Sequence, residues 1–444
     1  MKYFRRAIST ILIFLVANQF SIYNMWVKNP SAIAISAMIS AVYLLIFNIK
    51  PTLKKHSTKR IAAMSNGTEL LFVFICTVTL STIWAAVVYF TDMMSGKNTL
   101  INIALVAVVC SIIFWNGIIR VYLTSVQLGI KWRVIGIICG MIPVANILVL
   151  TKIISLTDNE TEVEEDRFVL DNTRVESEIC KTKYPVIMVH GVFFRDFRFL
   201  NYWGRIPAAL KKNGADIYYG GQQSAAAVKD CGVELAEKIK SVVEETGCEK
   251  VNIIAHSKGG LDSRYAISNC GMDKYVASLT TVNTPHRGCI FAKELIGKAS
   301  DNLKSFVSSK YNSTLLRLGD KAPDFMAAVT DLTDESCAEL NKICPDMAGV
   351  YYQSVGSYMK KLTGGKFPLN VSYNIVKKYD GVKNDGLVEI ESMKWGESFT
   401  LAEPKGRRGI SHGDMIDLNR ENIDGFDVRE FYISIVSKLK DMGY

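Results

Sequence analysis

The fold of the second half of the chain is decided by one run, Val251-Asn252-Ile253-Ile254-Ala255-His256-Ser257-Lys258-Gly259-Gly260. Its first five residues predict a buried strand, and the stretch from 260 to 269 predicts a helix. Small residues stand two positions before and after Ser257, as a tight strand-to-helix turn requires, because larger side chains would collide there. Such a turn exposes the serine hydroxyl at a helix N-terminus, where backbone N–H groups can stabilise an oxyanion. The run therefore predicts a nucleophilic serine, although a serine can also precede two glycines by chance.

Short apolar runs and longer helical stretches alternate around this turn. Strands are predicted at 185–190, 216–220, 251–255 and 276–282, and helices at 225–246 and 260–269. Such alternation favours a mostly parallel sheet covered by helices on both faces, which is the α/β class. We expect one such domain over residues 184–444.

The first predicted strand ends in His190-Gly191-Val192-Phe193. In α/β-hydrolases the loop after this strand supplies one oxyanion donor, and the residue after the nucleophile supplies the other. The predicted donors are the backbone N–H groups of Val192 and Lys258. For His190 we expect a structural role in holding this loop.

The candidate general base is identified by chain order. The five histidines are His56, His190, His256, His286 and His412. The fold requires the order serine, acid, histidine, and His286 follows Ser257 too closely to leave room for a strand carrying the acid. His412 lies in a late glycine-flanked loop and is the predicted base, with an aspartate to orient it. Asp380 and Asp385 are both candidates for that acid, and each precedes a glycine in what could be an ordinary turn.

From about Tyr184 to the C-terminus the chain resembles the bacterial triacylglycerol lipase family of the Pseudomonas–Burkholderia kind and its Firmicute relatives, within the α/β-hydrolase superfamily. The resemblance is carried by the runs YPVIMVHG at 184–191, VNIIAHSKGG at 251–260, TPHRG at 284–288 and NDGLV at 384–388. It implies that Asp385 is the triad acid and His412 the base. It also implies a lid near 290–334, where Phe291, Leu295, Ile296, Leu303, Phe306 and Val307 recur at helical spacing. The same apolar face could equally be core packing.

The family also holds a structural calcium ion beside the histidine loop. Asp414 matches one ligand of that ion, but no aspartate occurs between Asp346 and Asp380, where another is expected, and Leu418 replaces an expected glutamine. We therefore expect no required cofactor, with Asp414 as a calcium ligand or simply a brace of the loop.

The first 155 residues carry five apolar stretches long enough to span a bilayer, at 7–25, 31–48, 69–90, 100–119 and 134–154. They predict an all-α bundle of about five transmembrane helices. Basic residues gather before the first stretch and in alternate loops, whereas the other loops carry only Lys28 and Lys97. The positive-inside rule then places the N-terminus in the cytoplasm, and an odd number of spans predicts an extracytoplasmic catalytic domain. The expected protein is thus an integral, multi-pass membrane protein.

An acidic linker is expected between the two parts, at 156–183. Its segment 158–167 combines low hydrophobicity with high negative charge, which is typical of a mobile tether. The whole chain has 444 residues, a net charge of +9 and ten cysteines. No basic run interleaved with aromatic residues occurs in the globular part, so no nucleic-acid partner is indicated. That part has seven cysteines, an odd number that argues against a full disulfide framework, although Cys337 and Cys344 could form one local bridge.

The sequence thus predicts a membrane-anchored serine ester hydrolase acting on carboxylic esters of lipids, with Ser257, His412 and Asp385 as its triad. Two other functions fit the same residues. One is a lipid acyltransferase that uses the same acyl-enzyme, and the other is a non-catalytic membrane module that binds a partner. The sequence names no protein partner.

Overall fold

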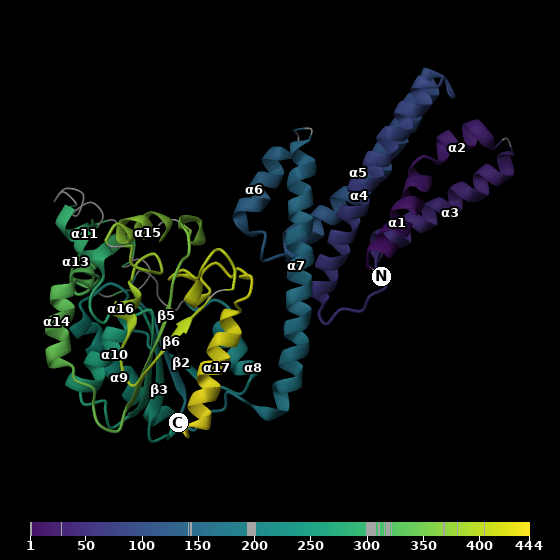
Figure 1. The fold of residues 1–444 in the computed structure, drawn as a ribbon. Coiled ribbons are helices and arrows are strands. Elements are labelled where there is room, and N and C mark those ends of the chain that lie inside the picture. The colour runs from purple at the N-terminus through teal and green to yellow at the C-terminus, as the bar shows by residue number, and fades with distance from the viewer. Residues whose placement is uncertain are drawn as a thin grey trace. The chain divides into compact units, whose positions relative to one another are not determined.

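The computed structural model describes residues 2–27, 29–140, 142, 144–192, 201–298, 308–309, 311–314, 316, 320, 322–366, 369–379, 381–403 and 405–444. The chain forms two compact units, Met1–Leu170 and Asp171–Tyr444 (Figure 1).

The first unit is all-helical. Its helices are α1 (Lys2–Ala17), α2 (Gln19–Trp26), α3 (Pro30–Ile49), α4 (Lys59–Phe90), α5 (Gly96–Thr124), α6 (Gly129–Cys139) and α7 (Ala145–Arg174). Among the described residues, α3, α4 and α5 are long and apolar enough to cross a membrane, and α1 with α2 makes a fourth candidate if this bent pair is one span. The unit is therefore compatible with membrane anchoring, with fewer candidate spans than the five expected.

The bend in the first candidate span lies at a polar residue. Asn18 separates α1 from α2, which meet at 63°. Its side-chain amide donates to Ser81 Oγ at 2.7 Å, and its carbonyl oxygen accepts from Asn102 Nδ2 at 3.0 Å. All three side chains are buried. The polar break in the apolar pattern is thus satisfied by residues of α4 and α5 rather than by water.

The stretch 134–154, expected to be one span, is divided in the structure. It contains the second half of α6, a turn, and the start of α7. The two helices run side by side at Gly136, where an added Cβ atom would lie only 3.2 Å from Ile153 Cδ1 (Figure 1). The expected fifth span is therefore a helical hairpin. Hydropathy alone misses the turn, since apolar residues continue through it.

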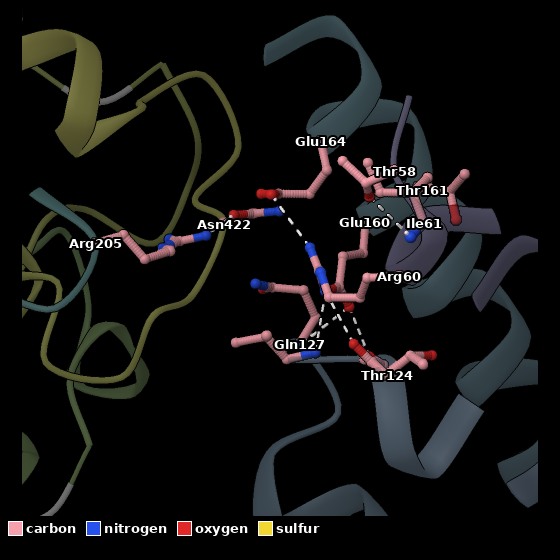
Figure 2. Close-up of polar contacts among 12 residues, drawn as sticks. Thr58, Arg60, Ile61, Thr124, Gln127, Glu160, Thr161, Glu164, Arg205 and Asn422 are labelled. Carbon is pink, nitrogen blue, oxygen red and sulfur yellow. Dashed lines mark hydrogen bonds and ion pairs between the residues drawn. The ribbon is translucent and has the colours of Figure 1, made fainter. Parts of the chain in front are cut away.

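The acidic stretch 158–167 is helical and lies within α7, so the expectation of a mobile tether there is wrong. Its carboxylates are bound by groups of the same unit. Glu160 is 1% exposed and accepts from Arg60 at 2.9 Å and from Ser125 Oγ at 2.6 Å, while Glu164 lies 3.2 Å from Arg60 (Figure 2). Composition predicts disorder here because it cannot show that the compensating cations come from α1 and α4.

The second unit is built on a sheet of six parallel strands in the order β2-β1-β3-β4-β5-β6. The strands are β1 (Val186–Val189), β2 (Ile217–Tyr219), β3 (Val251–His256), β4 (Val276–Val282), β5 (Tyr351–Ser357) and β6 (Ser398–Ala402). The first four match the strands predicted from the sequence. The parallel sheet with helices on its faces confirms the α/β-hydrolase class.

Successive side chains of each strand enter different cores, as a sheet covered on both faces requires. In β1, Val186 and Met188 pack with helices α8 (Ile206–Lys212) and α17 (Val428–Asp441). Ile187 and Val189 pack with helices α9 (Val228–Thr246) and α10 (Lys258–Asn269). The helices α9 and α10 also match the predicted helical stretches.

The remaining α-helices among the described residues lie between β4 and β6. They are α11 (Ile290–Lys298), α13 (Phe325–Thr330), α14 (Asp334–Ile343), α15 (Leu369–Lys377) and α16 (Ile390–Met393). One-turn 3₁₀ helices lie before β1, at Val175–Ser177, and after β5, at Leu362–Gly364 and Asp414–Ile416.

Candidate active site

Ser257 lies at the sharp turn between β3 and α10. Its backbone has φ 55° and ψ −131°, a conformation that costs free energy for any residue but glycine and is concentrated at functional sites. Two hydrogen bonds hold the turn: Ser257 N donates to Val282 O at 2.9 Å, and Thr284 Oγ1 donates to Ser257 O at 2.8 Å. The strained geometry of a nucleophile turn is therefore present and is braced from β4 and the residues after it.

Glycines allow the loop after β1 to approach this turn closely. A Cβ atom on Gly191 would lie 2.8 Å from Ser257 Cβ, and one on Gly259 would collide with the His190 carbonyl. The backbone of Val192 comes directly after Gly191, in a residue that is 7% exposed. Lys258 is the first residue of α10, so its N–H has no acceptor within the helix. The two predicted oxyanion donors thus belong to the two segments that meet at Ser257.

The Lys258 side chain is buried on its own helix. Its ammonium lies 2.7 Å from Asp262 Oδ1. Burial acts to lower the pKa of Lys258, but the Asp262 carboxylate outweighs it and raises that pKa. The lysine is therefore a charged, paired residue that stiffens the first turn of α10.

Asp385 and His412 are in contact. His412 Nδ1 lies 2.6 Å from Asp385 Oδ2, and Asp385 is fully buried. The other carboxylate oxygen accepts from the backbone N–H groups of Leu387 and Val388, at 2.9 and 2.8 Å. His412 N also donates to the Asp385 carbonyl at 2.9 Å. The NDGLV run therefore forms a turn around its own aspartate and directs Oδ2 of that aspartate toward the histidine.

His412 lies beside the serine turn. Its ring centroid is 4.4 Å from that of His256, the residue directly before Ser257. Burial, together with the neighbouring His412, lowers the pKa of His256. His256 therefore stays neutral and adds no positive charge next to His412.

Two residues that the sequence did not single out complete this region. Asn283 comes after β4 with φ 50°, and its amide donates to Asp385 Oδ2 at 2.6 Å and to Ser357 Oγ at 2.7 Å. The Tyr202 hydroxyl accepts from Gly191 N at 3.0 Å and is hydrogen-bonded to His256 Nδ1 at 2.8 Å. Tyr202 thus connects the loop after β1 to the serine turn. A sequence signal existed only for Asn283, as a polar residue at the end of a buried strand.

The other two histidines of this unit have structural contacts, His190 with the backbone and His286 with side chains. The ring nitrogens of His190 lie 3.0 Å from the carbonyl oxygens of Gly191 and Gln222. His286 is fully buried, lies 2.9 Å from Thr281 Oγ1 and stacks on Trp395. Burial lowers the pKa of His286 well below its usual value.

Asp414 braces the histidine loop. Its Oδ2 accepts from the backbone and the hydroxyl of Ser411, at 2.8 and 2.7 Å, and its Oδ1 pairs with Arg408 at 3.1 Å. Arg408 also reaches Glu421 at 3.1 Å. Within the described part of the chain, no group of three or more His, Cys, Asp or Glu residues is arranged to hold a metal ion. A guanidinium thus occupies the contact that the resemblance assigned to calcium.

The lid-like stretch is described only in part. Phe291 and Ile296 are partly buried against a cluster that includes Val388 and Met393, which favours core packing for this portion of α11. The Leu295 side chain and the residues Leu303, Phe306 and Val307 lie outside the described residues, as does Asp380, the competing acid.

Comparison with known proteins gives one family match, two related lipases and one similar solved structure. The family described as "Putative serine esterase (DUF676)" matches residues 186–358. A triacylglycerol lipase of Pseudarthrobacter phenanthrenivorans is 35% identical over 178 residues, which is 37% of this chain and 54% of that lipase. A triacylglycerol lipase of Vibrio cholerae is 28% identical over 240 residues, covering 49% of this chain and 76% of its own. The solved structure of Staphylococcus hyicus lipase superposes with a TM-score of 0.47 at 19% identity, over 59% of this chain and 97% of that one.

The parallel sheet and the strained turn at Ser257 give the globular half the α/β-hydrolase fold. The two curated lipases confirm that this half of the chain resembles the bacterial triacylglycerol lipase family. The chain spans about half the length of the curated lipases of P. phenanthrenivorans and Burkholderia plantarii that it matches, 54% and 49% respectively.

Proposed function

We propose that this protein is a multi-pass, membrane-anchored serine ester hydrolase that cleaves carboxylic esters of lipids. The observation that supports this most is the 2.6 Å contact between His412 Nδ1 and a fully buried Asp385, beside the strained turn that carries Ser257.

In the first half of the reaction, Ser257 Oγ attacks the acyl carbonyl carbon and its proton passes to His412 Nε2. Asp385 holds the imidazole with its proton on Nδ1 and stabilises the imidazolium that forms. The carbonyl oxygen becomes an oxyanion, which the N–H groups of Val192 and Lys258 stabilise. The ester C–O bond then breaks, and His412 returns the proton to the departing alkoxide.

In the second half, water replaces the alcohol. His412 removes a proton from the water as its oxygen attacks the acyl carbon, and the second tetrahedral intermediate uses the same oxyanion donors. Collapse breaks the bond to Ser257 Oγ, which regains the proton from His412, and the carboxylic acid leaves.

A lipid ester is the substrate class that suits the rest of the chain. Three or four helices able to cross a membrane hold the domain next to a bilayer, where lipid esters are concentrated. The named relatives are triacylglycerol lipases.

The test is hydrolysis of acyl esters of increasing chain length by the full chain in detergent micelles. We expect S257A to lose hydrolysis and labelling by a fluorophosphonate probe while keeping the circular dichroism spectrum of the wild type. The matched control is S434A, since Ser434 is an exposed serine of α17 that bonds only to Phe431 O in its own helix. Activity retained by S257A would refute the assignment of the nucleophile.

The same assay separates the other two functions. Run with an alcohol acceptor, it yields a new ester in place of free acid if acyl transfer is the physiological reaction. Wild-type protein that neither hydrolyses esters nor reacts with the probe would instead be a binding module.

A further inference from the structure

Contacts within the first unit show which helix ends lie together. At the N-terminus, Arg6 forms two hydrogen bonds of 3.0 Å to Asp158, and Lys2 lies 3.1 Å from Glu162. The start of α1 and the acidic part of α7 are therefore at the same end of the helical bundle.

The loops after α3 and α5 join this same end. Arg5 donates to Thr52 Oγ1 at 2.6 Å, just beyond the end of α3. Arg60, at the start of α4, donates to the carbonyl of Thr124, the last residue of α5, at 2.9 Å and also binds Glu160 (Figure 2). The helix ends at residues 2, 49, 59 and 124 thus all surround the acidic part of α7.

The opposite end of the bundle is defined by α2. Ser21 N donates to Asn102 Oδ1 at 3.1 Å in the second turn of α5, and Ser21 Oγ contacts Met94 Sδ at 3.2 Å in the α4–α5 loop. The bent pair α1–α2 therefore runs from one end to the other. Together with α3, α4 and α5 it makes four passes, and α5 ends where α1 begins.

The hairpin of α6 and α7 is too short to make a fifth pass. It begins at the N-terminal end, where Arg133 donates to Ser125 O at 2.6 Å and Glu160 accepts from Val126 N at 3.0 Å. The 11 residues of α6 rise about 16 Å, roughly half of the ~30 Å hydrocarbon thickness. The chain then turns, and α7 is back among the same charged groups by Asp158.

The hairpin presents an apolar surface for which the bundle provides no cover. Ile137, Ile138, Val144 and Leu148 are each more than 60% exposed. An exposed patch of this kind in a unit made of apolar helices suits acyl chains, because the backbone groups of α6 and α7 are paired within their helices. Lys152, six residues before Asp158, is close enough to the charged end to extend its ammonium toward it.

We infer that the α6–α7 hairpin inserts into a single leaflet without crossing the membrane, and that the hydrolase unit is therefore on the N-terminal side, in the cytoplasm. Eleven basic residues lie at or near the N-terminal end: Lys2, Arg5, Arg6, Lys50, Lys54, Lys55, Lys59, Arg60, Arg120, Lys131 and Arg133. In sequence, the segments that join α2 to α3 and α4 to the first turn of α5 carry only Lys28 and Lys97, so the positive-inside rule places the first end in the cytoplasm.

The free state of the cysteines is consistent with a cytoplasmic hydrolase unit. All ten lie among the described residues and all are free thiols, including the buried Cys337 and Cys344 that could have formed a local bridge. Free cysteines are usual in a reducing compartment. The placement is opposite to the one that five crossings predict, and with the function proposed above it means that the substrate is drawn from the cytoplasmic leaflet.

The test uses the full chain with a protease-cleavable epitope at one of three places: before Met1, in the α4–α5 loop between Thr91 and Ser95, or after Tyr444. Protease is added to intact bacterial spheroplasts and to lysed ones. We expect only the loop epitope to be cut in intact cells, and all three after lysis. Cleavage of the C-terminal epitope in intact cells, with or without cleavage at the N-terminus, would overturn the inference.

The same three proteins are assayed for ester hydrolysis after lysis, and S257A is tested for topology alongside them. Topology as expected with no hydrolysis would refute the proposed function and leave the inference standing. Hydrolysis by a protein whose C-terminal epitope is cut in intact cells would overturn the inference on topology and leave the proposed function standing.

Discussion

Replacing Gly191 with alanine tests the architecture of the site with one added methyl group. The new Cβ would lie 2.8 Å from Ser257 Cβ, 3.0 Å from the Tyr202 hydroxyl and 3.1 Å from the His256 carbonyl. Ordinary contact begins near 3.4 Å, so the loop and the serine turn must separate by about 0.6 Å. Because Gly191 does not have a positive φ, alanine adds no backbone strain of its own, and the effect is that of displacement alone.

The displaced loop carries the Val192 N–H, one of the two predicted oxyanion donors. Loss of one such donor costs about 10²- to 10³-fold in kcat, and a misplacement of about 1 Å costs about 10²-fold. We therefore expect G191A to lower kcat roughly 100-fold with little change in KM, since the donor acts on the transition state rather than on the bound ester.

The assay is steady-state hydrolysis of a soluble ester, with thermal unfolding measured in parallel. The control is G96A, since Gly96 begins α5 and an added Cβ there meets nothing within 4 Å. A G191A enzyme with at least half of the wild-type kcat and an unchanged melting temperature would refute the reasoning, because the close approach would then impose no constraint.

Three further predictions concern the carboxylates. D385N should lower kcat about 10⁴-fold, because an amide in contact with His412 Nδ1 favours the wrong tautomer; a loss below tenfold in kcat measurements would count against Asp385 as the acid. Burial, reinforced by the charge of Asp385, raises the pKa of Glu389 to about 7 from a usual 4.5. The folded state therefore binds this proton more tightly than the unfolded state does. The stability of the protein is then highest below pH 4.5 and falls as the pH rises through 7. E389Q should therefore be more stable than the wild type, and its gain should grow from pH 5 to pH 8, up to about 3 kcal/mol in urea unfolding. A gain of equal size at pH 5 and at pH 8 would contradict this. R408A should lower kcat several-fold by loosening the Asp414 contact that braces the His412 loop. EDTA should leave the kcat of the wild type unchanged. Inhibition by EDTA that calcium reverses would show that a metal holds the loop.

The turn that carries Ser257 is the part of the candidate site whose geometry follows from local sequence. Ser257, Gly259 and the preceding strand lie within ten residues, and the constraint on each comes from its neighbours in the chain. Asn283 and Tyr202 were missed because their roles depend on partners 102 and 54 residues away.

The last two strands were missed for a related reason. The sequence of β5, YYQSVGS, carries polar residues that break the apolar pattern of a buried strand. In the sheet, Gln353 donates to Thr280 Oγ1 at 2.8 Å and Ser354 donates to Trp395 O at 2.7 Å. Buried polar groups are tolerated when they are paired, and the pairing is visible only in three dimensions.

In the helical half, hydropathy located the apolar segments but not their ends. It could not separate a continuous span from the hairpin of α6 and α7, since the residues around the turn between them are mostly apolar. Nor could composition show that Glu160 would meet Arg60, 100 residues earlier.

The polar break at Asn18 bears on how the protein is made. Its amide finds its partners in Ser81 and Asn102, which are synthesised 63 and 84 residues later. Until they arrive, the Asn18 amide has only the 3.0 Å bond from its Nδ2 to Phe14 O within α1, and its carbonyl oxygen enters hydrocarbon without a partner, at a cost of several kcal/mol. In the membrane-anchored protein proposed above, the first helix would therefore be held only weakly in the bilayer during translation, until α4 and α5 pack around it.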